Sequence, residues 1–92
     1  MSYADNSIYF MTMKMKQTDF FSSFDLALAA AIFLFYPLEA IDKENPRKAQ
    51  FLFKKTADLE KLVEDYWHGD LRIEPQAYFN ALRIIKARLY ER

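Results

Sequence analysis

Residues 22–36 read Ser-Ser-Phe-Asp-Leu-Ala-Leu-Ala-Ala-Ala-Ile-Phe-Leu-Phe-Tyr, and this stretch decides the fold. Residues 26–35 contain no charged or polar side chain, which predicts one helix that is apolar on every side. Ser22 is the expected N-cap, with Asp25 completing a capping box three residues later. Pro37 ends the helix, because the residue before a proline disfavours the α conformation. A helix of this kind has to be covered on all its sides.

The need to cover this helix predicts a protein contact, since a domain of this size buries only about 60–65% of the surface that its unfolded chain exposes. We therefore expect a small non-enzymatic interaction module that forms a homodimer, the commonest symmetric oligomer. A further protein partner, of unknown identity, is also expected. The side chains expected at the contact between two copies are Leu28, Ile32, Phe33 and Phe35.

The composition of the 92 residues is that of one globular domain with a modest core. Hydrophobic residues make up 52% of the chain and aromatic residues 17%, which excludes a disordered tail. The 13 basic and 13 acidic side chains cancel, so no net field attracts nucleic acid or a membrane surface. The apolar run is shorter than the roughly 20 residues that span a bilayer. Because the chain also lacks cysteine, we expect a cytoplasmic protein that does not enter a membrane.

The segment after the apolar helix predicts a β-hairpin. Residues 38–42 and 49–54 alternate between apolar and polar side chains, and Asn45-Pro46 between them is typical of a turn. In the second strand the odd-numbered residues share the face that is expected to lie on the helix. A two-stranded hairpin alone is only marginally stable. The extended residues 18–21, or the hairpin of a second copy, are therefore expected to add a strand.

Two amphipathic helices are predicted after the hairpin. Thr56 caps the first, Gly69 ends it in the left-handed conformation, and Pro75 occupies the first turn of the second. The stripes expected to face the core are Leu59, Leu62, Val63, Tyr66 and Trp67 in the first helix and Tyr78, Leu82, Ile85 and Leu89 in the second.

Together these elements predict an α+β fold. Its order is a short N-terminal extended segment, a buried apolar helix, an antiparallel β-hairpin and two C-terminal amphipathic helices. We expect residues 17–92 to form the single domain. Residues 1–16 are expected to be an N-terminal extension, either an edge strand or disordered, since residues 8–13 alternate only weakly.

Several blocks of this sequence resemble a short bacterial and phage domain family of unknown function. The blocks are Phe21-Ser-Ser-Phe-Asp-Leu-Ala-Leu-Ala-Ala30, Phe51-Leu-Phe53, Leu62-Val-Glu-Asp-Tyr66, and Phe79-Asn-Ala-Leu-Arg83-Ile-Ile-Lys86 with Leu89-Tyr90. The resemblance covers Thr18 to Tyr90, and its first block is the most specific. Family members commonly have glycine near the end of the first helix, where this chain has Tyr36-Pro37. The resemblance implies no activity.

No constellation of side chains predicts catalysis, a cofactor or a metal ion. His68 is the only histidine and cysteine is absent, so a metal site lacks convergent ligands. A triad of Ser22, His68 and Asp70 has no support in the spacing. Gly69, the only glycine, lies at a helix end and not in a phosphate-binding loop. We expect a protein that is not an enzyme.

Nucleic-acid binding is the alternative function. Basic side chains gather in the hairpin, and an aromatic and basic stripe runs along the last helix at i, i+4, i+7 and i+11. Cations attract phosphates, and aromatic rings stack on unpaired bases. The competing interpretation makes the aromatic residues part of the core or an interface, with the cations as its solvated rim. The residues expected on this surface are Lys43, Arg47, Lys48, Lys54, Lys55, Phe79, Arg83, Lys86 and Tyr90.

Overall fold

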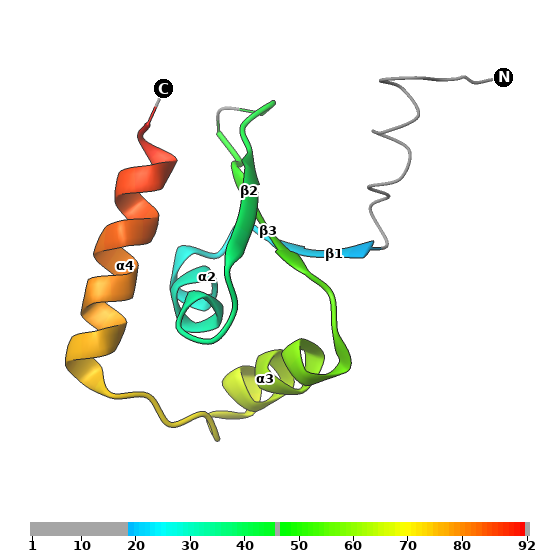
Figure 1. Ribbon diagram of the computed structural model, residues 1–92, viewed down its shortest axis with the longest axis vertical. Coiled ribbons are helices and arrows are strands. Elements are labelled where there is room, and N and C mark those ends of the chain that lie inside the picture. Colours follow the sequence, from blue (N-terminus) through cyan, green and yellow to red (C-terminus); the bar gives the residue numbers. More distant parts are fainter. Residues whose placement is uncertain (1–18, 46, 92) are drawn as a thin grey trace, which may run out of the picture.

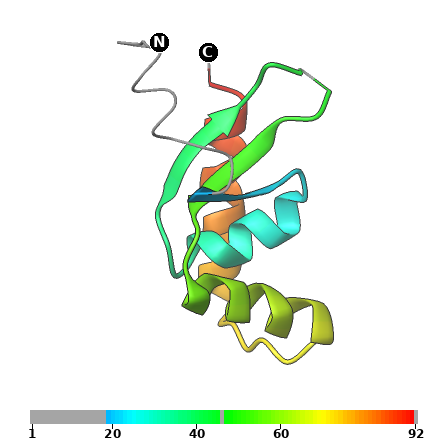
Figure 2. The same ribbon diagram turned by 90° about the vertical axis from the view of Figure 1, so that its right-hand side faces the viewer.

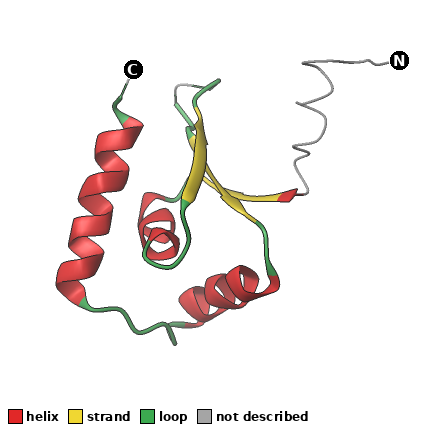
Figure 3. Cartoon of the chain, in the orientation of Figure 1, coloured by secondary structure: helices red, strands yellow, loops and turns green. Residues whose placement is uncertain are grey.

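The computed structural model describes residues 19–45 and 47–91, and it confirms the α+β class. The order is one strand, one helix, two strands and two helices (Figure 3). The extension predicted for residues 1–16, with its alternating residues 8–13, lies outside the described residues. The elements are β1 (Phe20–Ser23), α2 (Leu26–Phe33), β2 (Leu38–Asp42), β3 (Gln50–Lys54), α3 (Ala57–His68) and α4 (Pro75–Leu89).

The three strands form one antiparallel sheet with the order β1-β3-β2. β2 and β3 are the predicted hairpin, and β1 pairs with the other edge of β3. In the middle of the sheet Phe53 of β3 lies opposite Phe21 of β1 and Leu38 of β2. The register of β2 shifts between Leu38 and Ala40, which marks a bulge or irregularity. The segment before the apolar helix therefore completes the sheet without a second copy.

The core lies between one face of this sheet and the three helices. Alternation along β3 buries Phe51 and Phe53 on this face, while Lys54 is exposed. Two views at right angles show α2 enclosed by the sheet, α3 and α4 (Figures 1 and 2). The fully buried large side chains that meet there are Leu28, Ile32, Phe51, Phe53, Leu59 and Ile85.

The cap at the start of α2 differs from the predicted one. Ser22 lies in β1, opposite Leu52 of β3, so its main chain is extended and it does not precede the helix directly. Asp25 is the N-cap instead. Its carboxylate accepts hydrogen bonds from the main-chain N–H groups of Ala27 at 2.9 Å and Leu28 at 3.2 Å.

The end of α2 also differs, because the regular helix ends at Phe33 and not at Tyr36. The main-chain N–H groups of Phe35 and Tyr36 both bind the carbonyl of Ile32 at 2.9 Å. Shared bonds of this kind tighten a last helical turn. Pro37 follows this turn and precedes β2. The sequence therefore predicted correctly that the helix ends before Pro37, but it placed the last helical residue three positions too late.

A single copy of the chain covers α2. Residues 28–32 are at most 2% exposed, within a core built from the sheet, α3 and α4. The reason for expecting Leu28 and Ile32 at a contact between two copies therefore falls away, because both side chains already lie in the core of one copy. Phe33 is half-buried, and Phe35 is 53% exposed. Within residues 19–45 and 47–91 no helix has both the length and the hydrophobicity needed to cross a membrane.

The termini of α3 and α4 agree with the sequence, but one side chain of α3 does not. The Thr56 hydroxyl accepts a hydrogen bond from the main-chain N–H of Leu59 at 3.0 Å, and Gly69 ends α3 with φ at 76°. Glu74 caps α4 through its carboxylate. Trp67, predicted to face the core, is 62% exposed. The preceding residue, Tyr66, still packs against the core, so the turn of the helix places the Trp67 side chain toward solvent.

The inward stripe of α4 is confirmed and gains one member. Ile85 is fully buried, and Leu82 and Leu89 are half-buried. Ala81 joins them at 3% exposure, and its small side chain allows α4 to lie close against α2. The Tyr78 hydroxyl adds a hydrogen bond of 3.0 Å to a main-chain carbonyl of α2.

Candidate functional site

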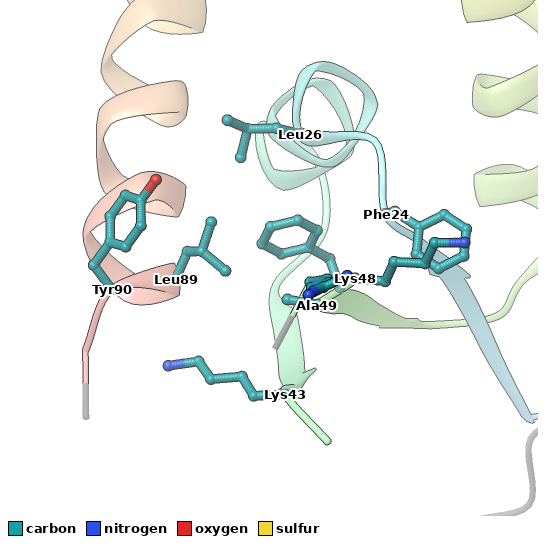
Figure 4. Close-up of a pocket in the computed structure, with 9 residues that line it drawn as sticks. Phe24, Leu26, Lys43, Lys48, Ala49, Leu89 and Tyr90 are labelled. Atoms are coloured by element: carbon teal, nitrogen blue, oxygen red, sulfur yellow. The ribbon is translucent and has the colours of Figure 1, made fainter. Parts of the chain in front are cut away.

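The structure brings four residues of the predicted nucleic-acid surface into one hollow, which we call the basic hollow. It lies between the hairpin loop, the start of α2 and the end of α4, and its volume is about 560 Å³ (Figure 4). No Asp or Glu of the described chain lines it, although the loop beside it contains Asp42 and Glu44. The four predicted residues in the lining are Lys43, Arg47, Lys48 and Tyr90.

Apolar side chains form the floor of the basic hollow, and aromatic rings stand at its rim. Phe51 of β3 is fully buried beneath it, and Leu26 and Leu89 line it from α2 and α4. Tyr90 stands on the α4 side and is 74% exposed, while Phe24 stands on the opposite side (Figure 4). An anion that carries a flat apolar group would meet cations at the rim and hydrophobic surface below.

The three cations of the basic hollow have different surroundings. The Lys43 ammonium donates at 3.3 Å to the main-chain carbonyl of Arg88, where the end of the helix dipole favours positive charge. The Lys48 ammonium lies 5.6 Å from the centre of the Phe24 ring, a cation–π contact. Arg47 is exposed in the hairpin loop. Lys43 is therefore held in place, while Arg47 and Lys48 face solvent at the rim.

The other predicted residues lie elsewhere. The lysines at positions 54 and 55 are at the far end of β3, where the second pairs with Glu60 of α3 at 3.8 Å. Arg83 and Lys86 are exposed along α4. Phe79 lines a different groove near the start of α4 and is 62% exposed. Because Phe79 and Tyr90 are both exposed, neither is a core residue of the single chain.

Sequence reasoning misses the apolar half of the basic hollow. It assigns Leu26, Phe51 and Leu89 to the core alone, and places Phe24 inside the buried helix. One signal identifies Phe24 as different: it directly precedes Asp25, the residue that caps α2. A residue before the cap lies outside the helix. Choosing Asp25 as the cap would have placed an aromatic ring in the turn.

Two tyrosines near the start of α2 have raised pKa values. Burial raises the pKa of Tyr66 most, followed by the negative charge of Asp25 and by Tyr78. Burial also raises the pKa of Tyr78, and Asp25 adds to it. Both phenols therefore stay protonated at neutral pH, and the Tyr78 hydroxyl donates to the main-chain carbonyl of Ala27. Among the side chains that the structure describes, no three His, Cys, Asp or Glu gather to hold a metal ion.

Comparison with known proteins identifies the family. The model of a domain of unknown function, DUF5659, matches residues 21–91, which agrees with the resemblance seen in the sequence. Searches of curated proteins and of solved structures find no match. Since the matched range includes every helix and nearly every strand residue described above, the chain belongs to the DUF5659 family of domains of unknown function.

Proposed function

We propose that this chain is a non-enzymatic binding module and that its basic hollow takes an unpaired strand of nucleic acid. The observation that carries the proposal is the lining, which combines three cations and two exposed aromatic rings without a carboxylate from the described residues. The overall charge is zero, so any attraction for phosphate has to come from local basic surfaces such as this one. We place this binding in the cytoplasm, in keeping with the cysteine-free sequence.

Each part of the basic hollow suits one part of a nucleotide. Arg47 and Lys48 at the rim offer charge to phosphates, and Lys43 adds a fixed charge beside them. Tyr90 and Phe24 offer rings on which a base can stack. Duplex bases hide their faces in the helical stack, so this geometry favours an unpaired strand.

Arg83 and Lys86 extend the basic surface along α4. They share one stripe with Phe79 and Tyr90, and the whole stripe is exposed. At 1.5 Å per residue, the stripe from position 79 to position 90 is about 16 Å long. A strand that leaves the basic hollow past Tyr90 would meet Lys86 and then Arg83.

The test is fluorescence anisotropy with a labelled unpaired oligonucleotide of about 12 nucleotides, within the range of site sizes of single-strand binders. We expect saturable binding that weakens between about 50 and 200 mM salt, because bound phosphates release counterions. Arg47→Ala and Lys48→Ala should each lower the salt slope by about 1. Tyr90→Ala should remove about 1–3 kcal/mol of binding free energy, the usual contribution of one base stacked on an aromatic side chain.

Lys54→Ala and Lys55→Ala are the matched controls, because they remove the same charge at the far end of β3. They should leave the affinity and the salt slope nearly unchanged. No anisotropy change at low salt contradicts the proposal. If the two control variants lose as much affinity as Arg47→Ala and Lys48→Ala, the oligonucleotide is attracted to the protein non-specifically. If poly-glutamate binds more tightly than the oligonucleotide, the ligand of the basic hollow is an acidic protein and not a nucleic acid.

Self-association is a second candidate function, supported by a single exposed ring. Phe35 is 53% exposed at the end of α2, whereas the guanidinium of Arg88 already lies 5.5 Å from the ring of Phe33. A symmetric contact through Phe35 would bury this apolar side chain in both copies. Sedimentation equilibrium should then show a dimer that Phe35→Ser converts to a monomer. A pure monomer at high micromolar concentration would end this candidate.

A further inference from the structure

A second groove lies at the opposite end of α4 from the basic hollow. It forms between the end of α3, the connection to α4 and the first turn of α4, with a volume of about 410 Å³. We call it the α3–α4 groove. Its lining consists of apolar and aromatic side chains around the helix-ending glycine. The lining residues are Tyr66, Gly69, Leu71, Ile73, Pro75, Tyr78 and Phe79.

Two large exposed rings extend the apolar surface of the α3–α4 groove. Phe79 lines it and is 62% exposed. Trp67 is equally exposed, and its ring lies 5.0 Å from the ring of Tyr66 in the lining. Exposed Trp and Phe next to a concave apolar surface are typical of protein contacts, where aromatic side chains provide much of the binding energy.

The charges around the α3–α4 groove are mainly negative. Its borders are the end of α3 and the connection that follows, and residues 64–74 hold four acidic side chains against Arg72. Asp65 is paired with Lys61 at 3.2 Å, and Arg72 donates to the main-chain carbonyl of Gly69 at 3.3 Å. The acidic residues are Glu64, Asp65, Asp70 and Glu74. This surface repels nucleic acid and attracts basic segments.

We infer that the α3–α4 groove binds a segment of another protein whose apolar side chains are flanked by lysine or arginine. The apolar side chains enter the groove beside Phe79 and Trp67, and the flanking cations meet the acidic border. The two ends of α4 would then serve different partners, nucleic acid at Tyr90 and a basic protein segment at Phe79. This inference does not depend on the function proposed for the basic hollow.

The experiment selects displayed random peptides on the full-length chain, with Phe79→Ala as the counter-selection target. Ile84→Ala is the control, since it removes another partly exposed apolar side chain of α4 that does not line the groove. We expect the selected peptides to contain Leu, Ile or Phe flanked by Lys or Arg. A synthetic copy should bind wild type and Ile84→Ala equally and Phe79→Ala at least about tenfold more weakly, a loss typical of a truncated anchor residue. Trp67, the only tryptophan, reports the binding through its fluorescence.

Replacing the lysines and arginines of the selected peptide by glutamate tests the charge argument. We expect at least about a tenfold loss of affinity, decreasing with added salt because the charges are exposed. The inference is wrong if no peptide distinguishes wild type from Phe79→Ala, or if the distinguishing peptides are acidic. It is also wrong if wild type is a dimer that Phe79→Ala dissociates, because a second copy then covers the groove. Circular dichroism of each variant confirms that it is folded.

Discussion

The helices α2 and α4 lie side by side, yet they meet solvent in opposite ways. α2 is short and has five consecutive residues, 28–32, that are almost completely buried. α4 is almost twice as long and buries only Ala81 and Ile85 to that degree. The apolar helix that decides the fold therefore offers very little surface for binding. In contrast, α4, which has a polar face, contributes to both proposed binding sites. Tyr90 lines the basic hollow at one end of α4, and Phe79 lines the α3–α4 groove at the other.

The largest expected difference between the two helices is in the cost of losing a buried side chain. Ile32→Ala should lower the free energy of unfolding by about 2–5 kcal/mol, because it leaves a cavity among α2, the sheet and α4. Ile84→Ala in α4 should lower it by only about 1 kcal/mol, because this side chain is 37% exposed. Urea denaturation measures both. Comparable losses would mean that α4 is as enclosed as α2.

The next effect concerns the start of α2. Asp25→Ala removes the acceptor of two main-chain N–H groups and should destabilise the fold by about 1 kcal/mol. Ser22→Ala should have little effect, because the Ser22 side chain is exposed in β1. Thermal unfolding of the two variants compares the observed cap with the predicted one. A larger loss for Ser22→Ala would restore the capping box of the sequence prediction.

The two tyrosines whose burial raises their pKa predict a pH dependence of stability. Tyr78 and Tyr66 both have a pKa raised above 10.0 in the folded state, so the unfolded chain ionises first as the pH rises. The stability that they contribute is present below pH 10 and is lost as the pH rises through their folded pKa values. Tyr78→Phe should cost about 1 kcal/mol at pH 7, one hydrogen bond, and should reduce this alkaline loss.

Urea denaturation at pH 8 and pH 11 measures the alkaline effect. The wild type should lose more stability between the two values than Tyr78→Phe, and more than Tyr66→Phe. An equal loss in all three proteins would mean that other groups cause the alkaline destabilisation.

The smallest effect belongs to the contact between the hairpin and the end of α4. Lys43 donates to the main-chain carbonyls of Arg88 and Glu91, where a cation at a helix end contributes about 0.3–1 kcal/mol. Lys43→Met should therefore destabilise the fold slightly at low salt, and added salt should remove the difference. Arg83→Met, which removes an exposed cation from the middle of α4, is the control. A salt-independent loss would indicate lost packing of the lysine stem.

The sequence predicted correctly those features that depend only on neighbouring residues, such as the ends of α3 and α4 and the buried face of β3. Thr56, Gly69 and Pro75 act within one turn of their own positions, and the alternation of β3 needs only its own residues. The choice between Ser22 and Asp25 as the cap is different, because pairing of β1 with β3 draws Ser22 into the sheet. The basic hollow is still more difficult to predict from the sequence. It joins Phe24, Lys48 and Tyr90, whose proximity follows from the docking of α4 beside the hairpin and α2.

The position of β3 between β1 and β2 has a consequence for synthesis of the chain. A ribosome delivers β1, α2 and β2 first, and the two outer strands are not neighbours in the sheet. Neither β1 nor β2 can pair with its neighbour in the sheet until residues 50–54 emerge. Before that, the apolar residues 28–32 have no sheet against which to pack. A nascent chain that is stalled before residue 50 therefore exposes the apolar surface of this helix to chaperones and to other nascent chains. Once residues 50–54 have emerged, β3 can pair with both outer strands.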